Sequence, residues 1–332
     1  MHVPFEKAVE VFSSLPAEKR FASNHPCYVV TDAFREDFLR PVFFVYTEGE
    51  ETYYHGFHLA PVLGTELNDI QSPYGYGGPV ATTAERGFLE RAWSSHVTWC
   101  KKNNVLAEFI RFHPLLENWQ YYQGDVVNDR ETVWIDLASP DILMSYQVRA
   151  RTAVKKAVKN GLYVEWHQGE HMAELFSDCY LEAMCAIGAD TSYFFNLDYF
   201  RKLLQWEGAR LAVCKLQDQL LAVAIFLVEE ASMEYHLSGA TSCGKKLAAT
   251  NLILHEAALL GQRIGCRSLH LGGGNDCHPD NPLLFFKSGF SEKRSLYKIG
   301  LRVHLEGHYA SLKSDWLEKG KEIPKKFLFY RF

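Results

Sequence analysis

The chain has 332 residues, of which 47% are hydrophobic and 14% aromatic, which suits a folded protein of about two domains. Its formal net charge of −5 argues against a protein whose whole surface binds nucleic acid. No apolar run approaches the roughly 20 residues of a membrane-spanning helix, and the first residues lack the layout of a signal peptide. We therefore expect a cytoplasmic protein.

The first half of the chain predicts four strands and one long helix. The helix opens at a capping-box pair, Thr82 and Glu85, and carries an apolar face as far as Cys100. A loop rich in glycine and tyrosine precedes it at residues 73–79. The strands are predicted as β-rich apolar runs at 41–46, 52–59, 105–112 and 132–137.

The second half predicts three helices, a meander of three strands, and then alternating helices and strands. Glycine stands where each of the first three helices would end, and short polar turns separate the three strands. The helices are predicted at about 145–160, 171–187, 197–206, 250–264 and 282–288. The strands are predicted at 209–216, 220–228, 233–239, 267–271 and 294–303.

The two halves repeat one order of elements, which suggests a duplicated lobe. We expect an α/β (α+β) fold with two lobes in tandem, each a mixed, mostly antiparallel sheet flanked by helices. The first lobe is predicted to span 1–140 and the second 141–305. The tail, 306–332, is expected to pack back on the first lobe.

Metal binding is not expected from the pattern of cysteines. The eight cysteines are scattered and form no C-x-x-C pair, so neither a zinc ribbon nor a thioredoxin motif is present. Cys277 and His278 form the tightest Cys/His pair, but two adjacent residues rarely hold one ion without further ligands.

Three stretches carry a resemblance to a known family. They are the Tyr/Gly-rich loop 73–79 with the strand and His-Pro pair that follow at 108–114, the basic segment 149–161, and the region from Tyr235 to Phe290. In this order the chain resembles the FemABX-type transferases, a branch of the GNAT acyltransferase superfamily whose fold is similar to two GNAT lobes. The resemblance covers most of the chain.

The resemblance implies a chemistry. Members of that family typically transfer an amino acid from aminoacyl-tRNA to the peptide of a cell-wall precursor, and no tightly bound cofactor is expected. One departure is Ala186, where the family pattern usually carries an arginine associated with substrate phosphate or carboxylate binding. This puts the usual cell-wall nucleotide acceptor in doubt, although a nucleotide-linked or peptide amine acceptor is still expected.

Transfer to an amine needs a proton acceptor and a positive charge near the oxyanion. Lys287 is the candidate for the positive charge, since Phe286 and Lys287 match the family's Phe-Lys pair. The alternative for Lys287 is an ordinary surface lysine, and the alternative for Phe286 is a side chain that only fills the core. His236, on the strand 233–239, is the candidate proton acceptor or a structural histidine. Alternation places it with Glu234, opposite Tyr235 and Leu237, and Tyr235 is expected to contact substrate.

Two groups in the first lobe are candidates for binding the acceptor. Tyr74 and Tyr76 lie in a glycine-rich, mobile loop suited to stacking or hydrogen bonding, with a plain turn as the alternative. Arg111 alternates with apolar neighbours on its strand and is expected to point into a cleft between lobes, or to form a buried ion pair.

The helix at 145–160 is the candidate site for phosphate or nucleic acid. One arc of this helix is apolar and consists of Ala150, Ala153, Val154, Ala157 and Val158. The opposite arc is basic, and no acidic residue interrupts it. Phosphates of a tRNA would suit such a face, and a solvated face is the alternative. The basic arc consists of Arg149, Arg151, Lys155, Lys156 and Lys159.

The donor and the class of protein stay open at this level. Acetyl-CoA-dependent GNAT enzymes normally carry an Arg/Gln-x-x-Gly-x-Gly/Ala loop before the main helix. The backbone amides of that loop bind pyrophosphate. Residues 241–249 lack that spacing, which favours aminoacyl-tRNA as donor. The alternatives are an acyl-CoA-dependent N-acyltransferase acting on an amino sugar or metabolite in surface-polysaccharide synthesis, and a non-catalytic binding protein.

Overall fold

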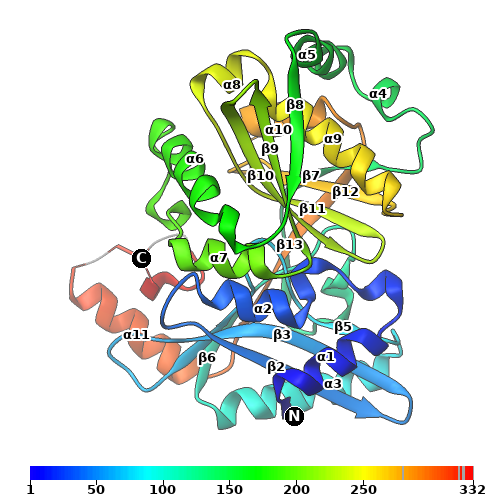
Figure 1. The fold of residues 1–332 in the computed structure, drawn as a ribbon. Helices are drawn as coiled ribbons and strands as arrows, with labels where there is room; N and C mark the ends of the chain where they lie inside the picture. Colours follow the sequence, from blue (N-terminus) through cyan, green and yellow to red (C-terminus); the bar gives the residue numbers. More distant parts are fainter. Residues whose placement is uncertain (279, 321, 324–325, 332) are drawn as a thin grey trace. The chain divides into compact units, whose positions relative to one another are not determined.

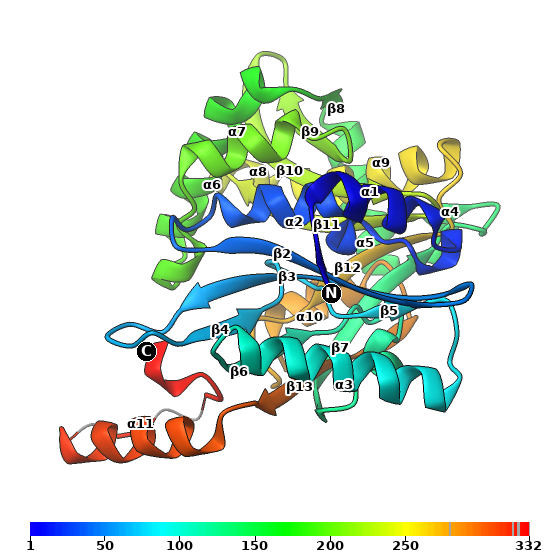
Figure 2. The same cartoon turned by 90° about the horizontal axis from the view of Figure 1, so that it is seen from below.

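The computed structural model describes residues 1–278, 280–320, 322–323 and 326–331. The chain divides into two compact units: Met1–Asp129 with Tyr297–Phe332, and Arg130–Leu296. Figures 1 and 2 label the elements of both. Within the described residues, no helix is both long enough and apolar enough to cross a membrane.

The first unit is built on a mixed sheet. Its strands pair in the order β1-β2-β3-β4-β6-β13, and all neighbours are antiparallel except β4 and β6. The strands are β1 (His2–Val3), β2 (Arg40–Glu48), β3 (Glu51–Pro61), β4 (Asn68–Gln71), β6 (Val105–Arg111) and β13 (Arg294–Val303), with β5 (Val80–Ala81) paired to β3. The helices are α1 (Phe5–Ser14), α2 (Pro26–Ala33), α3 (Arg86–Lys102) and α11 (Glu306–Glu318).

Alternation along the strands of this sheet supplies two cores. Phe44 packs with the apolar face of α3, whereas the adjacent Phe43 and Val45 pack with α1, as the period of two in a strand requires. Figure 2 shows α3 on one face of the sheet and α1 and α2 on the other. The predicted strands at 41–46, 52–59 and 105–112 coincide with β2, β3 and β6 to within two residues at each end.

The C-terminal segment packs within the first unit. Tyr309 of α11 joins a cluster with Leu106 and Leu328. Arg331 donates from Nε to Asp69 Oδ2 over 2.6 Å, and its Nη2 reaches the carbonyls of Ala60 and Pro61 at 3.1 Å. The segment is thus fastened by apolar contacts and by an ion pair with a fully buried carboxylate.

The second unit repeats this sheet. Its strands pair in the order β7-β12-β11-β10-β9-β8, and all neighbours are antiparallel except β11 and β12. The strands are β7 (Asp125–Asp136), β8 (Leu162–His167), β9 (Ala209–Leu216), β10 (Gln219–Glu229), β11 (Ser232–Ala240) and β12 (Ser268–Gly273). The helices are α4 (Ile142–Ser145), α5 (Val148–Lys159), α6 (Ala173–Ala186), α7 (Leu197–Gln205), α8 (Ser242–Lys246), α9 (Ala249–Arg263) and α10 (Pro282–Ser288).

Helices cover both faces of the second sheet (Figure 1). Side chains of α5 and α9 form one core with alternate residues of β9 and β10, among them Ala212, Ala222 and Phe226. Helices α6 and α7 lie on the other face, where α6 contacts β10 and β11. The buried residues of α5 are Ala150, Val154 and Ala157. Val158 was expected on the same arc but is 58% exposed, because it lies at the edge of the buried stripe.

The fold class expected from the sequence is confirmed: both sheets are mixed, mostly antiparallel and flanked by helices. In each unit an antiparallel meander leads to a parallel pair joined by one long helix, α3 or α9, and a final antiparallel strand closes the sheet. That final strand comes from the other half of the chain in both units. β7 follows β6 in sequence but pairs with β12, and β13 follows β12 but pairs with β6.

The division of the chain reflects this exchange of strands. The lobes were expected to be consecutive in sequence, with 1–140 first and 141–305 second. In the structure the chain passes between the units within β7 and within β13. Sequence order places β7 with the elements that precede it, and β13 likewise. Hydrogen bonding instead pairs each of these strands with the sheet of the other unit.

The start of α3 differs from the expected capping box. Glu85 is the N-cap, and its carboxylate accepts from the amides of Gly87 and Phe88. The Thr82 hydroxyl instead binds the carboxylate of Glu51 and the amide of Thr52. A carboxylate close to the first free amides of a helix satisfies them and the helix dipole together.

Candidate active site

Strands β11 and β12 separate in the middle of the second sheet. Their parallel pairing runs only from Ser232–Ser268 to Glu234–His270, although β11 continues to Ala240. Each strand has a bulge just after this point. In β11 the bulge is at His236, and in β12 it is at Leu271. Because bulges bend a strand and increase its twist, they end the pairing here.

Lys287 is held near this point by the short helix α10. Asn281 caps the helix, its side-chain oxygen accepting from the amides of Leu283 and Leu284 at 3.0 and 3.1 Å. Pro282 stands at the first helical position, where its missing amide costs nothing. Lys287 lies in the last turn, and its side chain turns inward rather than to solvent.

The environment of Lys287 is unusual for a lysine. The residue is only 7% exposed, and its Nζ donates to the Gly273 carbonyl over 2.7 Å. An ammonium has three N–H donors, and this is the one hydrogen bond that it makes with a described residue. No described carboxylate pairs with it. Burial therefore lowers the pKa of Lys287 to about 7, because desolvation disfavours the charged form.

Tyr235 and His270, two ionisable groups beside Lys287, have pKa values that favour their neutral forms near pH 7. The Nζ of Lys287 lies 6.0 Å from the ring centroid of Tyr235, whose hydroxyl donates to Ser238 Oγ. Burial raises the pKa of Tyr235 to about 12. Burial, and secondly the charge of Lys287, lower the pKa of His270 to about 3. These neighbours supply no negative charge that would hold Lys287 protonated.

Glycine is required at the position that binds Lys287. A Cβ on Gly273 would lie 2.7 Å from the carbonyl oxygen of Glu131 in β7, which is too close for any side chain. Gly272 has a φ of 77°, in the region that glycine adopts readily. The sequence left open whether the three glycines allow a ligand to approach or turn the chain; Gly272 and Gly273 fit the end of β12 against β7.

Phe286 and Arg149 hold α10 in place. Phe286 packs half-buried against the α5/α9 core, with its ring centroid 5.6 Å from that of Phe290. Arg149 on α5 donates to the Phe285 carbonyl at 2.8 Å and to Ser288 Oγ at 2.7 Å. Arg149, expected to bind phosphate, thus spans the turn that carries Lys287.

His236 faces away from this group. Its Nε2 lies 3.0 Å from the hydroxyl of Tyr199 on α7, whereas Tyr235 belongs to the α5/α9 core. The bulge also changes the alternation predicted for the strand: Tyr235 pairs with Phe226 and Leu237 with Ile225, so these two side chains lie on opposite faces. The structure brings Lys287, Tyr235 and Phe286 together and places His236 on the α7 side.

The remaining basic residues of α5 divide into two groups. Arg151 donates to the carbonyls of Met144 and Tyr146 and so fastens the start of the helix. Lys156 is exposed, and its Nζ bonds the Lys246 carbonyl at the end of α8 over 2.8 Å. We call the five lysines of this surface the α5/α8 basic cluster: Lys155, Lys156, Lys159, Lys245 and Lys246.

The acceptor candidates from the first half all lie in the first unit. The loop with Tyr74 and Tyr76 was expected to be mobile, but it is tied at several points. The Tyr74 amide donates to Asp32 Oδ2 at 2.8 Å, and the Gly77 amide to the Arg111 carbonyl at 2.7 Å. Tyr76 packs edge-on against His113 and Tyr297.

Arg111 forms no ion pair with any described residue, in contrast to the structural alternative considered for it. It is half-buried, and its guanidinium lies over the ring of Phe109, 5.0 Å from the centroid. Its side chain is therefore held by a cation–π contact, with several donors unassigned.

A surface depression of about 500 Å³ lies beside α10, lined by Glu131, Asp280, Pro282, Leu284, Phe285, Ser288 and Arg294. Lys287 and Tyr235 are not among its lining residues. The depression and the buried lysine therefore use different faces of the same helix.

Sequence reasoning missed the backbone partner of Lys287 and its neighbour His270. The Gly-Gly-Gly run was a visible signal for the first. His270 sits in an apolar strand, and no local pattern marks it as a neighbour of a lysine seventeen positions further on.

Comparison with known proteins identifies the fold. No family model matches the sequence, and no curated protein does. Among solved structures, FemX superposes with a TM-score of 0.70 over 94% of this chain and 99% of its own, at 14% identity. The chain has the FemX fold.

Two further structures share this FemX fold. One is the C-terminal domain of a protein described as a putative lysylphosphatidylglycerol synthetase, from Agrobacterium fabrum, with a TM-score of 0.61 and 13% identity over 95% of this chain and 98% of that one. The other is L-PGS from Bacillus licheniformis, with a TM-score of 0.55 and 14% identity over 89% and 90%. The FemABX resemblance seen in the sequence is thus confirmed for the fold.

Proposed function

We propose that the chain is a transferase that moves an aminoacyl group from aminoacyl-tRNA to an amine of a cell-wall or related precursor. The observation that carries this proposal is the buried amine of Lys287, held by one carbonyl where β11 and β12 separate, without a carboxylate partner among the described residues. A buried lysine in this state favours an anion beside it.

The proposed chemistry is ester aminolysis. The neutral acceptor amine attacks the ester carbonyl, the new C–N bond forms, and negative charge collects on the carbonyl oxygen. Lys287 in its protonated form stabilises that oxyanion more than the uncharged ester, which lowers the barrier selectively. As the C–O bond breaks, the proton lost by the amine passes to the leaving ribose oxygen.

A pKa of about 7 suits Lys287 both in the free protein and when an anion lies beside its Nζ. Burial favours the neutral amine in the free protein, which avoids the cost of an unpaired buried charge. An anion arriving beside Nζ raises the pKa and draws in a proton. The cation therefore forms when the negative charge that needs it is present.

The choice of donor is supported by α8 and by the α5/α8 basic cluster. Residues 242–246, where acetyl-CoA-dependent GNAT enzymes are expected to carry a pyrophosphate loop, form the short helix α8. The Gly244 amide is already bonded to Thr241 Oγ1 at 3.0 Å, so it is not available to a pyrophosphate. The lysines of the cluster suit the phosphates of a longer, polyanionic donor.

The proposal is tested by offering the purified chain labelled aminoacyl-tRNA, acyl-CoA and a panel of amines, including peptide and nucleotide-linked precursors. We expect transfer of label from tRNA to an amine, without release of thiol from acyl-CoA. Thiol release coupled to acylation of an amine would replace the proposal with an acyl-CoA-dependent N-acyltransferase. Tight binding of tRNA with no transfer to any amine would indicate a binding protein.

A further inference from the structure

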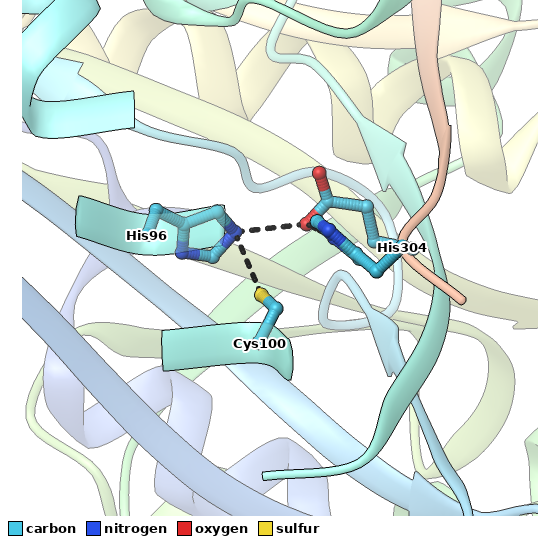
Figure 3. A group of neighbouring side chains, drawn as sticks. His96, Cys100 and His304 are labelled. Carbon is cyan, nitrogen blue, oxygen red and sulfur yellow. Dashed lines mark hydrogen bonds and ion pairs between the residues drawn. The ribbon is translucent and has the colours of Figure 1, made fainter. Parts of the chain in front are cut away.

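A second cluster of reactive side chains lies in the core of the first unit, apart from the site proposed above. It consists of His96, Cys100, Glu108 and His304, all buried. One ligand atom from each lies within 4.8 Å of every other. Figure 3 shows His96, Cys100 and His304 converging, with His96 in contact with the Cys100 sulfur.

Rigid elements position all four residues. His96 and Cys100 stand four positions apart on α3, so both project from one face of the helix. Glu108 lies in β6, and Tyr122 donates to its Oε1 at 2.9 Å, which leaves Oε2 to face the histidines. His304 follows β13, and its amide donates to the Leu106 carbonyl at 2.9 Å.

The side chains converge on one point, and their hydrogen bonds to one another leave His304 unsatisfied. His96 Nε2 is 2.9 Å from Glu108 Oε2 and 3.5 Å from Cys100 Sγ. His304 Nε2 lies 3.5 Å from the same carboxylate oxygen. Neither ring nitrogen of His304 has a hydrogen-bond partner among the described residues. A fully buried imidazole directed at a shared oxygen in this way has the arrangement of a ligand.

We propose that His96, Cys100, Glu108 and His304 bind a structural Zn²⁺ ion. Zinc prefers four ligands of the Cys, His and carboxylate types at about 2.0–2.3 Å, which separates neighbouring tetrahedral ligand atoms by roughly 3.3–3.7 Å. The separations of 2.9, 3.5 and 3.5 Å need adjustments of a few tenths of an ångström. The remaining pairs, which lie within 4.8 Å, close by up to roughly one ångström when the ion binds.

The charges and the burial support the same metal. A thiolate and a carboxylate together balance Zn²⁺, so the occupied site carries no net charge into an apolar core. Four protein ligands with no exposed face leave no position for a reacting water, which is the mark of a structural rather than a catalytic zinc site. The ion would join α3 and β6 to the chain that returns some two hundred residues later at His304.

The test uses the purified full-length chain, stripped with a chelator and titrated with Zn²⁺ or with Co²⁺ as a spectroscopic probe. We expect about one ion per chain, a raised thermal midpoint, and with cobalt the visible bands of a tetrahedral site together with a thiolate charge-transfer band. Cys100→Ser should remove the charge-transfer band and weaken zinc binding at least about 100-fold.

Two controls make the outcome decisive. Cys214→Ser changes an equally buried cysteine of the second unit and should keep both the stoichiometry and the cobalt bands. His304→Gln provides a second ligand change should Cys100→Ser fold poorly, and should likewise lose the metal. A wild-type chain that takes up neither ion, or a thiolate band that survives in Cys100→Ser, would overturn the proposal.

Discussion

The Nζ of Lys287 donates to the carbonyl oxygen of Gly273 over 2.7 Å, inside the second unit where the side chain is buried. A backbone carbonyl orients the amine without neutralising it. Burial lowers the pKa of Lys287 to about 7, whereas a carboxylate partner would raise it.

The first prediction concerns turnover. Lys287→Met keeps the bulk of the side chain but removes the amine, so it should lower kcat about 100-fold or more while KM changes less than about threefold, as for a group that acts in the transition state. Steady-state kinetics with the donor that supports transfer in the assay above would measure both. Lys293→Met, at a lysine that is 58% exposed in the same unit, is the matched control. Unchanged kcat in Lys287→Met would remove the lysine from its proposed role.

The second prediction concerns stability and pH. The pKa of Lys287 is lowered from 10.5 to about 7, so between these values the unfolded chain binds more protons and unfolding is favoured as pH falls. The wild type should gain stability relative to Lys287→Met as pH rises from about 7 to 10. Since one pKa unit corresponds to about 1.4 kcal/mol, the gain should reach a few kcal/mol in urea titrations. A flat difference would contradict the buried state of the amine.

The third prediction concerns anion binding. A phosphate or carboxylate ligand that reaches Lys287 should bind with uptake of a proton, so its affinity should rise as pH falls from about 8 to 6. Calorimetry in buffers of different ionisation enthalpy measures the uptake directly. In Lys287→Met the uptake should disappear, and uptake that persists there would have to come from another group.

The fourth prediction concerns the α5/α8 basic cluster. Replacing Lys155 and Lys159 with serine should weaken tRNA binding and reduce the dependence of log affinity on log salt by about 0.7–0.9 for each phosphate that the variant no longer neutralises. Filter binding at several salt concentrations measures both. The matched control is the pair Lys313→Ser and Lys319→Ser on and after α11, which should leave the slope unaltered. Equal slopes in both double variants would exclude the cluster as the tRNA-binding surface.

The fifth prediction concerns the C-terminal segment. Arg331→Met removes the partner of Asp69, a carboxylate that is fully buried, and should lower the free energy of unfolding by about 3 kcal/mol. Chemical denaturation measures this decrease. Arg201→Met, which breaks an exposed pair with Glu174, should cost less than about 1 kcal/mol. Similar decreases in the free energy of unfolding for the two variants would show that the burial of Asp69 does not strengthen its ion pair with Arg331.

Local sequence patterns predicted the elements well because alternation and helical spacing are short-range properties. The strands at 209–216 and 220–228, and the helix at 250–264, fall almost where β9, β10 and α9 lie. The pairing of strands is a long-range property, and no local sequence pattern indicates that β7 and β13 are exchanged between the two sheets.

The candidate sites show the same limit. Lys287 was selected through the family's Phe-Lys pair, but its burial and its bond to Gly273 depend on how α10 meets the end of β12. The bulge at His236 shifted a strand register that simple alternation had assigned. The cluster of His96, Cys100, Glu108 and His304 draws on three elements. Only its helical pair, four residues apart, can be recognised in the sequence, and it does not have the C-x-x-C spacing.

The exchange of β7 and β13 also bears on how the chain is made. Residues 130–296 contain every strand from β8 to β12 and most of β7, so this unit can complete its sheet soon after it leaves the ribosome. Residues 1–129 emerge earlier, yet β6 lacks its antiparallel neighbour until β13 has been synthesised. An open strand edge of this kind invites pairing with other chains. The half translated first is therefore the half that finishes folding last.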